Sequence, residues 1–136
     1  MAPPFPEDIV RRFAAAINSH DADAVAAFFT DDHVFIDSLG NRLTGRQNLL
    51  LGWRKYFQMF PDYSIQISSL ATHHSTVAAF GSASGTYAAA RDPALGAWTV
   101  PAAWRAIVAG SRIAEWQVYA DNSPVVQILQ NSAQDP

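Results

Sequence analysis

Asp37 is the best single candidate for a catalytic residue. It lies at the end of a short strand-like segment. Residues 33–37 fit a strand in which Phe35 and Asp37 share one face. If that face points inward, the carboxylate lies among apolar side chains, and desolvation raises its pKa. Asp37 is therefore a candidate general base for proton transfer. Its alternative role is structural, since an aspartate at a strand end also caps a turn such as residues 38–41.

Asp121 is a second, weaker candidate for a catalytic carboxylate. It is followed by Asn122, Ser123 and Pro124. In one interpretation it stands at the mouth of a pocket and assists the chemistry there. In the other it makes an Asx turn before the proline, which is the interpretation that the turn-forming neighbours favour.

The spacing of the four histidines argues against a metal centre. His73 and His74 are adjacent, so in a strand they point to opposite faces. His33 lies roughly 13 Å from Asp37 along an extended strand, too far for an imidazole–carboxylate dyad. We expect His33 to be an ordinary surface histidine, and we expect no metal and no cofactor.

Composition excludes several classes of protein. The 136 residues suit one domain, and 49% hydrophobic residues can fill a core. The net charge of −3 and the scattered basic residues argue against nucleic acid and membrane surfaces as partners. The absence of cysteine excludes a disulfide scaffold and a cysteine nucleophile. The chain starts without a signal-peptide pattern and has no run of about 18 apolar residues, so we expect a cytoplasmic protein.

Three helices are predicted in the first half of the chain. Pro6 begins the first, whose apolar residues recur at helical spacing as far as Ile17. Asp21 is the predicted N-cap of the second, which is expected to run through Val25, Phe28 and Phe29. Thr44 and Gln47 fit a capping box for the third, which Pro61 ends.

The second half of the chain is strand-like. Strands are predicted near residues 63–71, 76–89, 97–108 and 112–120, with a tight hairpin at Ala109 and Gly110 between the last two. Small residues at 81–85 would let a long strand bend. Helices and strands that are segregated in this way predict an α+β fold, in which helices cover one face of a curved antiparallel sheet. We expect a single domain over residues 1–136, with frayed ends near 1–4 and 131–136.

Several motifs resemble the nuclear-transport-factor-2-like superfamily, and within it the SnoaL-like group of polyketide cyclase and ketosteroid isomerase relatives. The motifs are IVRRFAAAIN at 9–18, His20-Asp21, FFTDD at 28–32, FIDSLG at 35–40, TGR at 44–46 and GSRIAEW at 110–116. The resemblance implies a cone-shaped fold, with a strongly bent, mainly antiparallel sheet packed on three N-terminal helices. It also implies one deep pocket and a homodimer. Asp37 matches the general-base aspartate of the ketosteroid isomerases.

The resemblance and the strand faces together suggest which residues line that pocket. A two-residue hairpin turn sets Ala103 opposite Trp116 and Pro101 opposite Val118, with Trp104 and Tyr119 on the outer face. Trp116 and Tyr56 have an alternative role as ordinary core residues. The expected pocket residues are Phe13, Phe35, Trp53, Tyr56, Pro101, Ala103, Trp116, Val118 and Ala120.

The chain departs from the catalytic pattern of both named relatives. The oxyanion-hole tyrosine of the isomerases falls on Phe13, and the protonated aspartate falls on Ala102 or Ala103. The acidic position of the cyclases falls on Val118. Each missing oxyanion donor commonly costs two to three decades in rate, so we expect no efficient ketosteroid isomerase.

Three functions remain open from the sequence. The first is an enzyme that binds a small, largely apolar molecule and performs isomerisation, cyclisation or dehydration, with Asp37 as base. The second is a binding module that uses the same pocket without turnover. The third, compatible with either, is a dimeric interaction domain whose outer sheet face, with Trp104 and Tyr119, pairs with a second copy.

Overall fold

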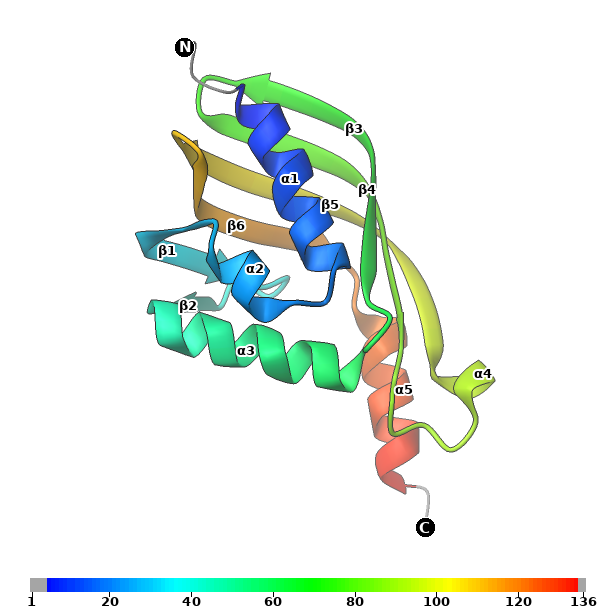
Figure 1. The fold of residues 1–136 in the computed structure, drawn as a ribbon. Coiled ribbons are helices and arrows are strands. Elements are labelled where there is room, and N and C mark those ends of the chain that lie inside the picture. The colour runs from blue at the N-terminus through cyan, green and yellow to red at the C-terminus, as the bar shows by residue number, and fades with distance from the viewer. Residues whose placement is uncertain (1–4, 135–136) are drawn as a thin grey trace.

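Helices and strands alternate irregularly along the chain in a computed structural model, which describes residues 5–134 (Figure 1). The helices are α1 (Pro6–Asn18), α2 (Ala22–Ala26), α3 (Arg46–Met59), α4 (Pro93–Gly96) and α5 (Ser123–Gln134). The strands are β1 (Phe29–Ile36), β2 (Arg42–Thr44), β3 (Ser64–His73), β4 (Thr76–Thr86), β5 (Ala97–Ala109) and β6 (Arg112–Ala120). No helix in the described range is long and apolar enough to cross a membrane.

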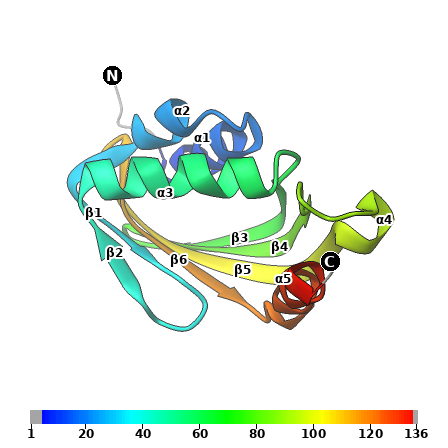
Figure 2. The ribbon, with the colours of Figure 1, turned by 90° about the horizontal axis from the view of Figure 1, so that it is seen from below.

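The six strands form one sheet in the order β2-β1-β6-β5-β4-β3. Only β1 and β6 run parallel, and the other neighbours are antiparallel. Figure 2 shows the sheet curling beneath α1, α2 and α3, with α4 and α5 at one end. The predicted α+β fold, with helices over one face of a bent and mainly antiparallel sheet, is confirmed.

The first two helices begin where the sequence predicts them, but α2 ends at Ala26, and Phe29, which was expected in this helix, begins β1. Pro6 lies in the first turn of α1, and the apolar stripe of this helix is fully buried against the sheet at Phe13 and Ile17. Asp21 caps α2 by accepting hydrogen bonds from the backbone of Asp23 and Ala24.

The bend in the sheet depends on Gly81 in β4. A Cβ added at Gly81 would overlap the carbonyl oxygen of Gln66 in β3, so only glycine lets the two backbones approach this closely. The pairing of β3 with β4 shifts register between Ile67 and Ser69, beside this contact. The small residues at 81–85 thus stand at the bend, as the sequence predicted.

The predicted capping box of α3 is wrong. Thr44 is the last residue of β2 and pairs with Val34 of β1, so its backbone is committed to the sheet. The N-cap is Gly45, with φ at +92°, and no side chain caps this helix. The pairing with β1 therefore overrides the local capping signal, and glycine supplies the left-handed turn between strand and helix.

Three short or terminal elements were not predicted. Strand β2 and helix α4 lie in segments to which the sequence analysis assigned no strand or helix, and α5 occupies the stretch after β6. Fraying was expected from residue 131, but residues 131–134 are helical. The other residues expected to fray, 1–4 and 135–136, lie outside the described residues.

The predicted β5–β6 register is also wrong. The hairpin turn is Gly110 and Ser111, and the pairing shifts again between Ile107 and Val108. As a result Trp116 pairs with Ala106, and Val118 with Trp104. Because side chains alternate along a strand, a one-residue shift exchanges the two faces of the sheet.

The new register reverses the expected faces of β5. Trp104 was expected on the outer face, but it is only 2% exposed and stacks on Trp116, with ring centroids 6.0 Å apart. Pro101 is exposed and Ala103 is half-buried, on the side away from the helices. The inner face of β5 is formed instead by Trp98, Val100 and the buried residues that follow them at every second position.

Candidate ligand cavity

A cavity of about 280 Å³ lies between α3 and the inner face of the sheet. Its walls are mainly apolar and aromatic. The lining residues are Phe35, Asp37, Ser38, Leu43, Leu49, Gly52, Trp53, Tyr56, Tyr63, Ala83, Trp98, Val100, Ala102, Trp116, Val118, Ala120 and Asn122.

Simple periodicities bring these residues to the cavity. The helix α3 contributes Leu49, Gly52, Trp53 and Tyr56, which share one helical face at spacings of three and four. Each of β5 and β6 contributes every second residue, which are 98, 100 and 102 in β5 and 116, 118 and 120 in β6. One helix face and two alternating strands are therefore enough to enclose the space.

Most of the expected pocket residues line this cavity, and three do not. Those in the wall are Phe35, Trp53, Tyr56, Trp116, Val118 and Ala120. Phe13 lies behind the wall, fully buried with its ring 4.9 Å from that of Trp116. Pro101 and Ala103 fall outside because of the shifted register. Of the two positions proposed for the missing aspartate, Ala102 is the one that lines the cavity.

The sequence analysis missed Tyr63 and the true inner residues of β5, above all Trp98. The signal in β5 was readable, because Trp98, Val100, Trp104 and Val108 alternate along the strand. The predicted hairpin register, however, placed these four residues on the outer face of the sheet. Tyr63 carried no signal, since it lies in the turn before β3.

Asp37 lines the cavity, and its carboxylate also holds the loop between β1 and β2. Its oxygens accept hydrogen bonds from Leu39 N, Asn41 N and Asn41 Nδ2 at 2.9–3.1 Å. Partial burial raises the pKa of Asp37, but the hydrogen bonds from this loop lower it more, so the net shift is downward. The expected rise in pKa is thus not found, and the carboxylate is a weaker base than an ordinary aspartate.

Asp121 does not line the cavity. It is exposed and accepts hydrogen bonds from the hydroxyl and the backbone N–H of Ser123, at the start of α5. The Ser123 hydroxyl, followed by the Ser123 N–H, holds the pKa of Asp121 below its ordinary value. This geometry is that of an Asx turn before a helix.

His33 is buried, not on the surface as expected. It is 2% exposed, its Nδ1 donates to the carbonyl oxygen of Ile113 at 2.5 Å, and its ring stacks on Phe29. Burial lowers the pKa of His33, and the bond to Ile113 offsets only part of this. His33 is therefore neutral and joins β1 to β6 through this hydrogen bond, and it does not line the cavity.

Two tyrosines and a tryptophan bring polar groups into the apolar wall. Burial raises the pKa of Tyr56 to about 12, and burial followed by the neighbouring Tyr56 raises the pKa of Tyr63 still further. Both hydroxyls are therefore protonated at any physiological pH. The indole Nε1 of Trp98 is buried and has no hydrogen-bond partner among the described residues.

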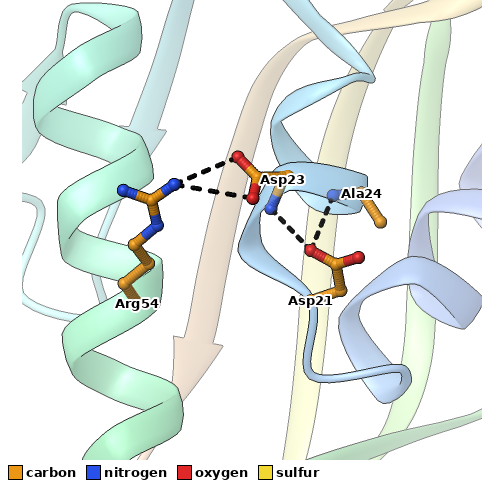
Figure 3. A network of polar contacts seen from close by, with 4 residues as sticks. All are labelled: Asp21, Asp23, Ala24 and Arg54. Atoms are coloured by element: carbon orange, nitrogen blue, oxygen red, sulfur yellow. Dashed lines mark hydrogen bonds and ion pairs between the residues drawn. The ribbon is translucent and has the colours of Figure 1, made fainter.

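A polar network on the outside fastens α2 to α3 (Figure 3). Arg54 of α3 reaches Asp23 at 3.2 Å, while Asp21 accepts from the backbone of Asp23 and Ala24. The ion pair is exposed and stabilises little by itself. Among the described residues, no group of three His, Asp or Glu side chains is arranged to hold a metal ion.

Comparison with protein families gives one match. The sequence profile of the SnoaL-like domain matches residues 10–116. No curated protein matches the chain.

Many solved structures share the fold. The sequence identities of the three described next are so low that they show a common fold and nothing more. A hypothetical protein with a ketosteroid isomerase-like fold from Catenulispora acidiphila, in complex with trimethylamine, is 21% identical with a TM-score of 0.79, over 95% of this chain and 98% of that one. A candidate SnoaL-like polyketide cyclase from Shewanella putrefaciens is 16% identical with a TM-score of 0.77, over 94% and 87%. An LEH-like epoxide hydrolase from M. tuberculosis is 17% identical with a TM-score of 0.75, over 94% of this chain and 91% of that one.

Proposed function

Because the chain belongs to the SnoaL-like domain family, we propose that it binds a small, largely apolar molecule in the cavity between α3 and the sheet. The observation that carries this proposal is the cavity itself, about 280 Å³ with walls formed mostly by aromatic and aliphatic side chains. Pockets that bind small molecules are typically of this kind, with a few polar groups for orientation. The trimethylamine complex of the Catenulispora acidiphila protein supports small-molecule binding by this fold.

Charge narrows the choice of ligand. The lining residues, all within the described part of the chain, include no Lys, Arg or His and a single carboxylate, Asp37. An anionic ligand would meet this carboxylate without a compensating cation. The cavity therefore disfavours anionic ligands, and its mostly apolar walls suit a largely apolar molecule.

Thermal unfolding with a panel of apolar carbonyl compounds, steroid enones and cyclic terpenoids tests the proposal. A ligand present at about 100 times its Kd should stabilise the protein by roughly 2.7 kcal/mol. Ala102→Phe fills the cavity and should abolish this stabilisation. Ala97→Phe, on the exposed side of the same strand, should leave it intact. A ligand that stabilises both variants equally would place its binding site outside the cavity.

Proton-transfer chemistry is the second candidate function, favoured by the position of Asp37 in the cavity wall. Isomerisation, cyclisation or dehydration would each use this carboxylate as base. Its hydrogen bonds and lowered pKa argue for binding without rapid turnover. The test is to incubate a ligand from the panel with the wild type and with Asp37→Asn. If the wild type converts the ligand and Asp37→Asn does not, the protein is an enzyme, and catalysis replaces simple binding as the first candidate function.

We also propose that two copies pair through the outer face of the sheet. Phe80, Ala103 and Tyr119 occupy directly paired positions on β4, β5 and β6, and the two aromatic side chains are 48% and 50% exposed. Exposed aromatic side chains in a row are typical of the core of a protein–protein interface.

A further inference from the structure

The cavity between α3 and the sheet has a buried aromatic end and a more open polar end. Trp98 and Trp116 line the cavity and are buried. Asp37 and Ser38, which follow β1, also line it but are only half-buried. The Ser38 hydroxyl accepts a hydrogen bond at 2.9 Å from the amide of Asn122, an exposed lining residue just before α5. The polar end therefore lies where the β1–β2 loop meets the start of α5, and it includes Asp37.

The carboxylate of Asp37 has no positively charged partner in the described part of the chain. Oδ1 accepts from Leu39 N and Asn41 N, and Oδ2 accepts from Asn41 Nδ2. All of these donors are neutral, and no described Lys, Arg or His forms an ion pair with Asp37. An ionised carboxylate offers about four acceptor sites, two on each oxygen, so Oδ2 keeps a site for a further donor.

Aromatic rings accompany this carboxylate in the cavity lining. Phe35 lies two residues before Asp37 and also lines the cavity, so both side chains belong to one face of the hairpin. The ring of Phe35 packs on that of Trp53 with centroids 6.2 Å apart, and Trp53 packs on Tyr56 at 6.3 Å. The faces of aromatic rings are negative and attract cations. The carboxylate and the rings therefore both favour a positive charge.

Ligand binding strengthens this preference. A molecule that fills the cavity removes water from Asp37, and a charge taken out of water is costly unless it is paired. The lining residues, all of them described, include no cation, so a neutral ligand leaves the carboxylate uncompensated. A ligand with an ammonium group brings the missing charge and also donates to the open site on Oδ2.

We infer that Asp37 is the ionic anchor for a protonated aliphatic amine, whose hydrocarbon body fills the aromatic end of the cavity. This inference rests on the proposed function, since it names the class of ligand that the same cavity takes. It gives Asp37 a role that needs a charged carboxylate, whereas a general base must take up a proton. The hydrogen bonds from the loop suit this role, because they hold the carboxylate in place before a ligand arrives.

The test uses three probes that share one hydrocarbon cage: adamantylamine, adamantanol and adamantane carboxylate. Their Kd values are measured by calorimetry on the full chain at pH 7 and low ionic strength. The amine should bind the wild type at least about tenfold more tightly than the alcohol, which corresponds to 1.4 kcal/mol, and the carboxylate should bind most weakly. In Asp37→Asn the amine and the alcohol should differ by about twofold or less.

Matched variants separate the charge of Asp37 from other effects. Asn41→Ala removes one loop hydrogen bond and keeps the carboxylate, and Asp121→Asn removes an exposed carboxylate outside the cavity lining. Both should keep the preference for the amine. As a second readout, nuclear Overhauser contacts should join the cage of bound adamantylamine to the ring of Trp53. Ala102→Phe should abolish binding of the amine and the alcohol alike.

The outcomes distinguish this inference from the proposed function. An alcohol that binds the wild type as tightly as the amine, or an amine preference that survives in Asp37→Asn, would overturn the ionic anchor and leave cavity binding intact. Loss of the preference in Asn41→Ala or Asp121→Asn would likewise show that the charge of Asp37 is not its cause. If no probe binds the wild type, or if Ala102→Phe leaves binding unchanged, the proposed function fails for ligands of this size, and the inference fails with it. The comparison of probes on the wild type holds even where a variant does not fold.

Discussion

At the scale of single residues, the fold keeps one ionisable side chain charged and another neutral. Asp37 remains charged and uses its carboxylate to hold the β1–β2 loop at the cavity wall. His33 is buried in its neutral form and joins β1 to β6 through Ile113. Both side chains affect stability, and each does so in a different pH range.

Asp37→Asn should lower the free energy of unfolding at pH 7 by about 0.5–2 kcal/mol, the range for loss of a capping side chain. The amide cannot accept from both Leu39 N and Asn41 Nδ2 with full strength. Because the folded pKa of Asp37 is lowered, its stabilisation is present above its ordinary value of 3.8 and is lost as pH falls through the folded value. Urea unfolding at pH 7 and at pH 3 measures this.

The matched control is Asp31→Asn, which alters an exposed carboxylate at the other end of the same strand and should have little effect. An unchanged or raised stability in Asp37→Asn would contradict the structural role. It would favour instead a carboxylate retained for catalysis at the expense of stability.

Replacement of His33 by asparagine should remove part of the acid sensitivity of the fold. The folded pKa of His33 lies below 6.5, so its contribution to stability is complete above pH 6.5 and falls as pH drops toward the folded value. In His33→Asn the amide can still donate to the carbonyl of Ile113, and it does not titrate. The loss of stability between pH 7 and pH 5 should therefore be smaller than in the wild type.

Denaturant unfolding at the two pH values checks this, with His73→Gln as the control for an exposed histidine. An equal loss of stability in His33→Asn and the wild type would show that His33 does not carry the acid sensitivity.

At the scale of elements, glycines decide how closely neighbouring segments approach. Gly81 lets β4 lie against the backbone of β3 at the bend of the sheet, whereas Gly52 stands on an exposed turn of α3 with ordinary space around it. The same substitution should therefore have opposite effects at the two sites. In the helix it removes the entropic cost of glycine, and in the strand it forces two backbones apart.

Gly81→Ala should destabilise the protein by about 3 kcal/mol or more, at the upper end of overpacking effects. Gly52→Ala should stabilise it by about 0.5–1 kcal/mol. The thermal midpoints of the two variants and the wild type provide the comparison. Equal midpoints for Gly81→Ala and the wild type would mean that β3 and β4 can separate at no cost, and that the bend does not need glycine.

At the scale of the whole molecule, the curled sheet has two faces with different tasks. The inner face packs on the helices and encloses the cavity, with Trp104 and Trp116 stacked in its core. The outer face presents the row of Phe80, Ala103 and Tyr119 to its surroundings. The proposed ligand cavity and the proposed pairing face are therefore separate surfaces, and a change on one should leave the other unaffected.

Tyr119→Glu should separate the proposed dimer without unfolding the chain, because the side chain is half exposed and lies away from the cavity. Sedimentation or light scattering should give twice the chain mass for the wild type and a single mass for the variant. Leu95→Glu, a 74% exposed apolar residue on α4, serves as the control and should remain dimeric. A monomeric wild type at about 100 µM would contradict the proposed pairing.

The elements that short-range patterns predicted correctly are those whose cause is local. Helix α1 follows from its apolar spacing and Pro6, α2 follows from the Asp21 cap, and the four long strands follow from their residue types. The α+β class also follows, because the order of elements restricts how they can pack. Even α5 had a local signal, in the apolar spacing of Val125, Ile128 and Leu129 after Pro124.

The lining of the cavity could not be predicted from the sequence, because it depends on contacts between distant parts of the chain. The shift between Ile107 and Val108 exchanges the faces of β5, and it is Trp98 and Ala102 that line the wall, not Pro101 and Ala103. His33 is buried by a partner 80 residues away in the sequence. Residue types specify helices and strands because the relevant interactions span a few residues, whereas a one-residue shift and the burial of a polar group depend on packing across the sheet.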